Sequence, residues 1–413
     1  MPRARSFRPD ALATGARRVL IYSHDTFGLG HLRRSRAIAN ALARGGEVEA
    51  TIISGSAVVD RFAFADGVAS VRVPGITKLP DGGYASLDAR VSLERTVARR
   101  ADIIARTAGI VRPDLMIVDK EPTGFHGEIL PTLERLRRSG CRLVLGLRDV
   151  LDDADRLVPE WERKGASEAV RRYYDEVWVY GLPQIHEPLS ALPVGAEIAA
   201  RTAYTGYLRR AVPRARAGRT EPVAATEPFV LVTPGGGGDG DGLIDWVIAA
   251  YEADPGIPYR ALVAFGPFMA QASRAAFLGR IAALSGRIAA ITFDSQIELL
   301  MEKAAGIVAM GGYNTFCEIL SFDKRALLVP RTHPRREQRI RAVAADALGL
   351  ARALLEEDGR SALRMAEALR ALPRQPLPSR ATMPGLLDGL DVIGRRVRAL
   401  TAPPVARRLA AAQ

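Results

Sequence analysis

The segment 306–342 constrains the fold more than any other part of the sequence. It opens with a short apolar run, residues 307–310, that is typical of a buried strand and is ended by Gly311 and Gly312. Apolar residues then recur at helical spacing over residues 314–320, and a second apolar run ends in a proline. A strand, a glycine turn, a helix and another strand are the building unit of a parallel α/β sheet.

Polar side chains follow two of these expected strands, where each strand ends. Asn314 and Thr315 open the helix, and a helix start offers unpaired N–H groups and partial positive charge to a phosphate. Glu318, one turn further on the same face, could accept hydrogen bonds from a ribose diol. Glu337 and Gln338 follow the next strand and face the same crevice, where open α/β sheets bind ligands. The alternative is a glycine cap and an Asn-capped helix with a solvated Glu318.

This ordered set of residues resembles the donor-nucleotide motif of GT-B glycosyltransferases, especially the MurG-like group whose C-terminal domains belong to glycosyltransferase family 28. The resemblance implies two Rossmann-like domains of mainly parallel sheet that face a cleft, with a final helix that crosses back. It also implies that the N-terminal half binds the acceptor and the C-terminal half the nucleotide-sugar. The residues that carry it are Gly311, Gly312, Asn314, Thr315, Glu318, Pro330, Glu337 and Gln338.

The length of 413 residues exceeds what one hydrophobic core normally supports, so we expect two domains. Strand-like and helix-like patterns alternate along both halves, which favours α/β layers in each. A segment rich in Pro, Arg, Ala and Thr separates the halves. We expect a flexible tail (1–16), an acceptor-binding domain (17–208), a linker (209–227), a nucleotide-sugar-binding domain (228–375) and a C-terminal helical extension (376–413).

A second motif follows the first expected strand, residues 18–23. Gly28 and Gly30 allow a tight turn, and they place His31 at its rim, where a helix begins. This G-x-G-H pattern matches the acceptor-side loop of the MurG-like family, whose histidine is a candidate base. An imidazole that titrates near neutrality can remove the proton of an acceptor hydroxyl. His31 could instead only order the loop, and the preceding His24 and Asp25 could compete for the role.

An acid beside His31 would fix its tautomer and stabilise the imidazolium. Asp119 ends the apolar run 115–119, and we expect that strand to lie near the first strand. Some relatives of the family use such a His–Asp pair. Glu121 is an equally reachable acid, so the pairing is a hypothesis at this point.

A glycine-rich loop, residues 233–242, follows the first strand of the second half. In the family this loop passes under the donor diphosphate, and we expect Gly237 and Gly238 to contribute there. Members of the family often bind the nucleobase through the loop that corresponds to residues 293–299. Uridine is the more common nucleoside in their donors. Arg331, Arg335 and Arg336 could contact the diphosphate or an acidic sugar, or could belong to a solvated basic helix face.

The formal net charge of +12 raises the question of an anionic partner. Only five of the 58 basic residues are lysines, and the arginines are scattered without interleaved aromatic residues, so we expect no nucleic acid. A peripheral contact with an anionic membrane surface fits the charge better. Neither a signal peptide nor an apolar run of membrane-spanning length stands out, and we expect a cytoplasmic protein, at the inner face of the membrane if it binds there.

The spacing of metal-ligating residues predicts neither a metal site nor a cofactor. Cys141 and Cys317 have no paired Cys or His, and the aspartates of the glycine-rich loop are typical of helix caps and solvated loops. The expected function is transfer of a sugar from a nucleoside-diphosphate-sugar, most readily a UDP-sugar, to a hydroxyl group of an acceptor. The acceptor is unknown and could be lipid-linked, a cell-envelope component or a secondary metabolite. Two alternatives remain: a nucleotide-sugar 2-epimerase or hydrolase on the same scaffold, and a non-catalytic nucleotide-sugar-binding subunit of a membrane enzyme.

Overall fold

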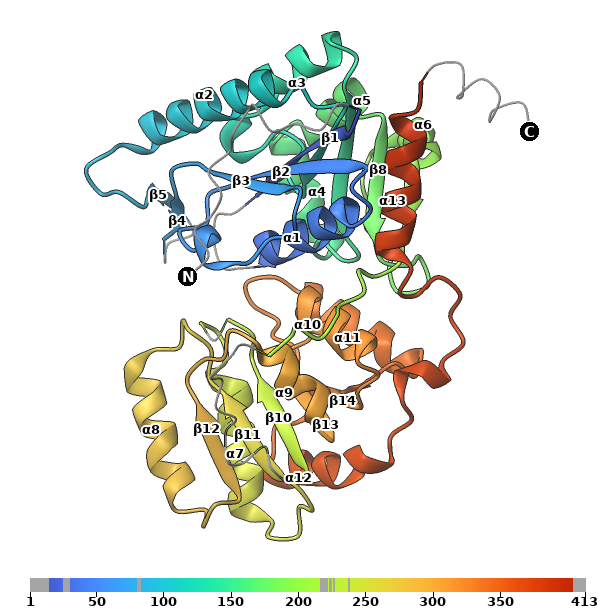
Figure 1. Cartoon of the computed structure of the whole chain (residues 1–413). Helices are drawn as coiled ribbons and strands as arrows, with labels where there is room; N and C mark the ends of the chain where they lie inside the picture. The colour runs from blue at the N-terminus through green and yellow to red at the C-terminus, as the bar shows by residue number, and fades with distance from the viewer. Residues whose placement is uncertain are drawn as a thin grey trace. The chain divides into compact units, whose positions relative to one another are not determined.

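The computed structural model describes residues 15–24, 30–79, 83–215, 222, 225, 227–236 and 238–403. Within them the chain divides into two compact units (Figure 1). The first unit contains the chain up to Pro183, Glu187–Leu208 and the residues from Asp388 onward. The second contains Gln184–His186 and Arg209–Leu387. The C-terminal helix therefore belongs to the same unit as the N-terminal strands.

A seven-stranded sheet forms the centre of the described part of the first unit, and all its neighbouring strands are parallel. Its first strand in the sequence lies in the interior of the sheet, which is the doubly wound arrangement of nucleotide-binding folds. Across the sheet the strands are β3 (Val68–Arg72), β2 (Val48–Ser54), β1 (Arg17–Ser23), β6 (Leu115–Asp119), β7 (Arg142–Arg148), β8 (Glu176–Tyr180) and β9 (Thr202–Tyr204).

Helices cover both faces of this sheet, with α2 (Leu93–Val111) and α3 (Leu130–Arg138) on one side and α1 (Gly30–Ala43) on the other (Figure 1). Every residue of β6 is buried, as a strand covered on both faces requires. A short antiparallel hairpin, β4 (Ile76–Lys78) and β5 (Tyr84–Ser86), lies outside the sheet. The remaining helices are α4 (Ala154–Arg163), α5 (Ala166–Tyr173), α6 (Gly195–Ala200) and α13 (Gly389–Leu400), with 3₁₀ turns at Val59–Arg61 and Phe125–Gly127.

Helix α13 returns to the first unit and packs against α1 (Figure 1). Ile393 and Val397, one helical turn apart, are its fully buried apolar contacts. Arg396 adds an ion pair to Glu176 of β8, with 3.0 Å between Nη1 and Oε2. Because a Cβ on Gly389 would lie 2.6 Å from the carbonyl oxygen of Gly206, only glycine allows the helix to start this close to the preceding chain.

The second unit repeats the doubly wound order in a six-stranded parallel sheet over the described residues. Helices α7 (Asp241–Ala253) and α12 (Ala362–Ala371) pack against each other beside it. The strands across the sheet are β12 (Ile288–Ile291), β11 (Arg260–Ala264), β10 (Phe229–Thr233), β13 (Gly306–Ala309), β14 (Ala326–Leu328) and β15 (Arg352–Ala353). The helices are α7 (Asp241–Ala253), α8 (Gln271–Ala282), α9 (Ile297–Lys303), α10 (Tyr313–Ser321), α11 (Glu337–Ala347) and α12 (Ala362–Ala371), with 3₁₀ turns at Glu356–Asp358, Leu372–Arg374 and Pro378–Arg380.

The predicted α/β class with two mainly parallel sheets is confirmed. The first helix begins at Gly30, so His31 lies in its first turn. The pattern did not predict the β4–β5 hairpin, because its strands of three residues are too short to show an alternation.

Candidate active site

The interior position of β1 brings two chain segments together at the carboxyl edge of the first unit's sheet. Strand β6 pairs directly with β1, so the residues that follow β1 meet the end of β6. His31 lies in the first turn of α1, after β1, and Asp119 is the last residue of β6. The sequence placed these two strands near each other, and the structure makes them neighbours.

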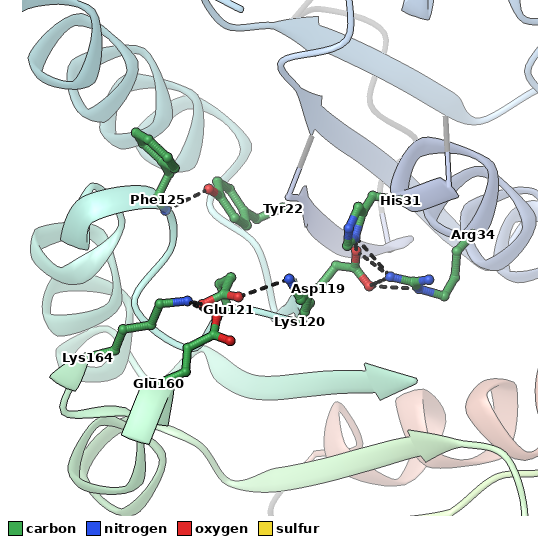
Figure 2. Close-up of polar contacts among 9 residues, drawn as sticks. All are labelled: Tyr22, His31, Arg34, Asp119, Lys120, Glu121, Phe125, Glu160 and Lys164. Carbon is green, nitrogen blue, oxygen red and sulfur yellow. Dashed lines mark hydrogen bonds and ion pairs between the residues drawn. The ribbon is translucent and has the colours of Figure 1, made fainter. Parts of the chain in front are cut away.

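His31 and Asp119 are in direct contact, with 2.5 Å between Nδ1 of the ring and Oδ2 of the carboxylate. Arg34, on the same face of α1, also reaches the carboxylate (Figure 2). The side chain of Asp119 is 4% exposed and that of His31 is 16% exposed. The structure therefore brings together the two residues proposed for catalysis and leaves part of the imidazole accessible to a ligand.

The charges in this cluster fix the protonation states. Burial raises the pKa of Asp119, but the positive charge of Arg34, followed by His31, outweighs burial and holds that pKa well below its usual range. Burial lowers the pKa of His31 to about 4, the charges of Arg34 and Lys120 act in the same direction, and Asp119 opposes them. At neutral pH the cluster thus contains a carboxylate and a neutral imidazole.

His24 is the other histidine at this edge of the sheet. Its ring lies edge-on to that of His31, with 5.8 Å between the centroids, and the residue is 6% exposed. Burial holds the pKa of His24 well below the usual value. His24 is therefore less accessible to a ligand than His31. Asp25 and Gly28 lie outside the described residues, and Gly30 is the first residue of α1.

The carboxylate of the second candidate acid, Glu121, forms ion pairs with two lysines (Figure 2). Its carboxylate lies 3.2 Å from Nζ of Lys120 and 2.8 Å from Nζ of Lys164, and Lys164 also reaches Glu160 at 2.6 Å. These lysines counteract the effect of burial and keep the pKa of Glu121 below its usual range. Asp119, and not Glu121, is thus the acid in contact with His31.

In the second unit, the turn after β13 has the conformation that its glycines suggested. Gly311 has φ +76°, a left-handed value that costs other residues energy, and Gly312 is the N-cap of α10. A Cβ on Gly312 would meet no atom within 4 Å, so the space beside this helix start is open. The fully buried Arg341 of α11 donates from Nη1 to the carbonyl oxygen of Gly311 at 2.9 Å and fixes the turn. Sequence reasoning missed Arg341.

The polar residues of α10 differ in exposure. Asn314 and Thr315 are half-buried in the first turn, and Oδ1 of Asn314 accepts a hydrogen bond from Nη2 of Arg210 at 2.8 Å. Since Gly312 occupies the cap, the alternative of an Asn-capped helix is wrong. Glu318 is 2% exposed, so the alternative of a solvated carboxylate is wrong as well.

Glu337 and Gln338 are both buried, in the first turn of α11, and both contact Arg331. Nη2 of Arg331 lies 2.9 Å from Glu337, its backbone N–H donates to Oε1 of Gln338 at 3.2 Å, and its Nε lies 2.6 Å from Asp239. Arg331 thus joins the acid–amide pair to the glycine-rich loop. It precedes α11, so its assignment to a solvated helix face is wrong.

The glycine-rich loop is described on both sides of Gly237, which itself lies outside the described residues. Gly235 has φ +82°, and Gly238 is exposed. The backbone N–H of Phe268 donates to the carbonyl oxygen of Gly236 at 3.0 Å, which ties the loop to the end of β11. Exposed backbone of this kind has room for an anionic ligand.

The described residues contain no group of three or more His, Cys, Asp and Glu side chains that could hold a metal ion. Cys141 and Cys317 are both buried. Over the same part of the chain, no helix combines the length and the apolar character that crossing a bilayer requires.

Residues 262–384 match the family model described as Glycosyltransferase family 28 C-terminal domain. The matched range contains the whole motif from Gly311 to Gln338 that resembles a donor-nucleotide site. No curated protein sequence matches the chain significantly.

Solved structures share the fold at low sequence identity. MurG of Acinetobacter baumannii is 12% identical, with a TM-score of 0.59 over 92% of this chain and 99% of MurG. A UDP-glucosyltransferase from Polygonum tinctorium capable of glucosylating indoxyl is 13% identical, with a TM-score of 0.62 over 95% and 100%. UGT2 of Phytolacca americana, in complex with UDP-2-fluoro-glucose and pterostilbene, is 12% identical, with a TM-score of 0.57 over 96% and 99%. The chain thus has the GT-B fold of these structures, and its residues 262–384 match the C-terminal domain of glycosyltransferase family 28.

Proposed function

We propose that the protein transfers a sugar from a nucleoside-diphosphate-sugar, a UDP-sugar first, to a hydroxyl group of its acceptor, with His31 as the general base. The observation that carries the proposal is the 2.5 Å contact between Nδ1 of His31 and Asp119. It orients an accessible imidazole whose other ring nitrogen, Nε2, can take a proton. The two UDP-sugar-related structures with this fold support the choice of donor.

On this proposal the second unit binds the donor. The open N-terminus of α10 faces the diphosphate, where unpaired N–H groups and the helix dipole stabilise the negative charge that develops on the leaving group. The backbone of Gly238 contributes on the glycine-rich loop. Glu318 binds the ribose, and Glu337 and Gln338 bind hydroxyl groups of the sugar.

The first unit then acts on the acceptor. Nε2 of His31 removes the hydroxyl proton while the acceptor oxygen forms its bond to the anomeric carbon. The bond between that carbon and the diphosphate oxygen breaks, and the nucleoside diphosphate leaves with the electron pair. Asp119 stabilises the imidazolium that results, in the way that a triad carboxylate does.

The test combines purified protein with a panel of UDP-, GDP-, ADP- and dTDP-sugars, with and without a panel of phenolic, lipid-linked and saccharide acceptors. Mass spectrometry identifies the sugar products, and a coupled assay measures the released nucleoside diphosphate. Transfer that requires an acceptor and is lost in His31→Gln supports the proposal. Free sugar or an isomerised sugar formed without acceptor would show the hydrolase or epimerase instead.

We also propose that the protein binds anionic membrane surfaces peripherally, because its formal net charge is +12. Co-sedimentation with vesicles of phosphatidylglycerol and phosphatidylcholine tests this. Binding should require the anionic lipid and weaken as salt rises; equal binding to neutral vesicles would contradict the proposal.

A further inference from the structure

The guanidinium group of Arg34 contacts both members of the His31–Asp119 pair. It lies three positions after His31 on α1, so both side chains point from the same face. Its Nη2 lies 2.6 Å from Oδ1 and 2.8 Å from Oδ2 of Asp119, and its Nε lies 2.8 Å from Oδ1. The same Nη2 lies 3.0 Å from Nδ1 of His31. Figure 2 shows the three side chains converging.

This arginine is almost completely removed from water. Its side chain is 2% exposed and that of Asp119 is 4% exposed. A buried ion pair pays a desolvation penalty and is often no more stable than a pair of apolar side chains of similar size. Stability alone is therefore a weak reason for an arginine at this position, and its effect on the neighbouring histidine is a stronger one.

The contacts determine which nitrogen of His31 carries the proton. Nδ1 has two polar neighbours, an ionised carboxylate that only accepts and a guanidinium that only donates. The 2.5 Å contact with the carboxylate requires a proton between the two atoms, so Nδ1 is protonated in the neutral ring. Nε2 then carries the lone pair. Among the described residues no group hydrogen-bonds to Nε2.

We infer that Arg34 is a positioning residue that keeps Asp119 ionised and orients it so that His31 presents an unprotonated Nε2 to the acceptor. The inference rests on the proposed function of His31 as the base. Arg34 itself touches neither the acceptor nor the donor in this account. It acts through Asp119, whose two oxygens it holds in one orientation.

The surrounding charges define what the loss of Arg34 would do. Besides Arg34, the neighbours of His31 that can carry charge include Asp119 at the end of β6, Lys120 directly after it, and His24 directly after β1. Tyr180 of β8 lies near Asp119 and Arg34. The positive charge of Arg34 opposes the effect of the Asp119 carboxylate on the pKa of His31. Without it the carboxylate would attract a proton to the imidazole, so His31 would become protonated at a higher pH.

The experiment is an NMR titration of ¹⁵N-histidine-labelled protein, which needs no substrate. The chain has five histidines, so His31→Gln assigns the signal of interest. In the unmodified protein we expect the Nδ1–H tautomer of His31, neutral down to a midpoint near pH 4. The Nε2–H tautomer, or a midpoint near the ordinary histidine value, would overturn the inference without any variant.

Variants of Arg34 test its contribution. In Arg34→Met the midpoint of His31 should rise by about 1 pH unit or more, and in Arg34→Lys, which retains the charge, by less. Arg100→Met is the matched control, because Arg100 makes a fully buried ion pair with Glu128, 2.6 Å from Nε to Oε2, which involves no histidine. It should lower stability and leave the His31 midpoint in place.

A folded Arg34→Met protein, judged by near-UV circular dichroism, with an unchanged midpoint would contradict the inference. If Arg34→Met does not fold, the tautomer in the unmodified protein and the Arg34→Lys titration decide. If His31 has the expected tautomer but the protein transfers no sugar, the effect of Arg34 on His31 is supported and the proposed function is wrong. If the protein transfers sugar while His31 has the other tautomer, the proposed function is supported and the inference about Arg34 is wrong.

Discussion

Nδ1 of His31 lies 2.5 Å from Oδ2 of Asp119, although the two residues are 88 positions apart in the sequence. The contact exists because β1 and β6 are neighbours in a parallel sheet and both end at the same edge. A polar group delivered by each of two adjacent strand ends is the usual way in which doubly wound sheets assemble a site. The contact joins an imidazole to a carboxylate, which is the pairing that the proposed base requires.

Asp119→Asn should reduce the rate of sugar transfer by ~10²-fold or more, because an amide no longer stabilises the imidazolium. Steady-state kinetics with the donor and acceptor identified by screening measure it. Asp175→Asn is the matched control, since Asp175 also pairs with an arginine, Arg142, at 2.8 Å, but at the opposite end of the strands. If the two variants lose activity equally, Asp119 has no special role.

The pH dependence of kcat/KM follows from the state of His31. The base must be neutral, and the pKa of His31 is lowered to about 4. The pKa of Asp119 is lower still, so the carboxylate remains ionised over the same window. We expect kcat/KM to be level through neutrality and to fall as the pH drops through about 4. Circular dichroism at each pH separates this fall from acid unfolding. An acid limb near pH 6.5 to 7, with the protein folded, would show that His31 is not the group that titrates.

The glycines before α10 should respond differently to substitution. Gly311→Ala should destabilise the protein by about 1–2 kcal/mol, because Gly311 is in the left-handed region. Gly312 has φ −57°, which any residue adopts, so Gly312→Val should cost less, about 0.5–1 kcal/mol, because valine is a poorer N-cap residue than glycine. The added side chain would instead fill the open space at the helix start and raise the donor KM. Thermal unfolding and donor kinetics on the pair measure the two effects. A Gly312→Val protein with normal donor KM would exclude the α10 N-terminus as the diphosphate site.

Arg331→Gln should raise the donor KM by ~10-fold or more, because it removes the guanidinium contacts to Glu337 and Asp239 together and each lost charge-assisted contact is worth ~1.5–3 kcal/mol. Arg339→Gln is the control, since Arg339 pairs with Glu357 on the surface. Donor-saturation curves at fixed acceptor measure both variants. Equal donor KM values in the two would contradict a link between Arg331 and the donor.

Part of this architecture was predictable from local pattern. The buried strands are continuous apolar runs, and the glycines mark the turns, so the alternation of strands and helices and the proximity of β1 and β6 followed from the sequence. The donor-motif residues and His31 could be singled out because they lie in the turns and first helical turns that follow strands. The roles of these residues remain predictions that the experiments above test.

The contacts that the sequence did not reveal are long-range pairings of charged side chains. Arg34 stands among many scattered arginines, and only its spacing of three from His31 could have drawn attention to it. Lys164 lies 43 positions from Glu121, and Arg341 lies 30 positions from Gly311. No periodicity encodes such pairs, since they depend on how separate elements pack.

Binding of nucleoside diphosphates is the direct test of a donor site at the N-terminus of α10. Calorimetry and thermal shifts with UDP, GDP, ADP and dTDP should show one favoured nucleotide, with stabilisation of ~2.7 kcal/mol at a hundredfold excess over its Kd. Gly312→Val should weaken that binding, while His31→Gln, in the other unit, should leave it unchanged. Absence of binding by all four nucleotides, or equal binding to the unmodified protein and Gly312→Val, would contradict the account.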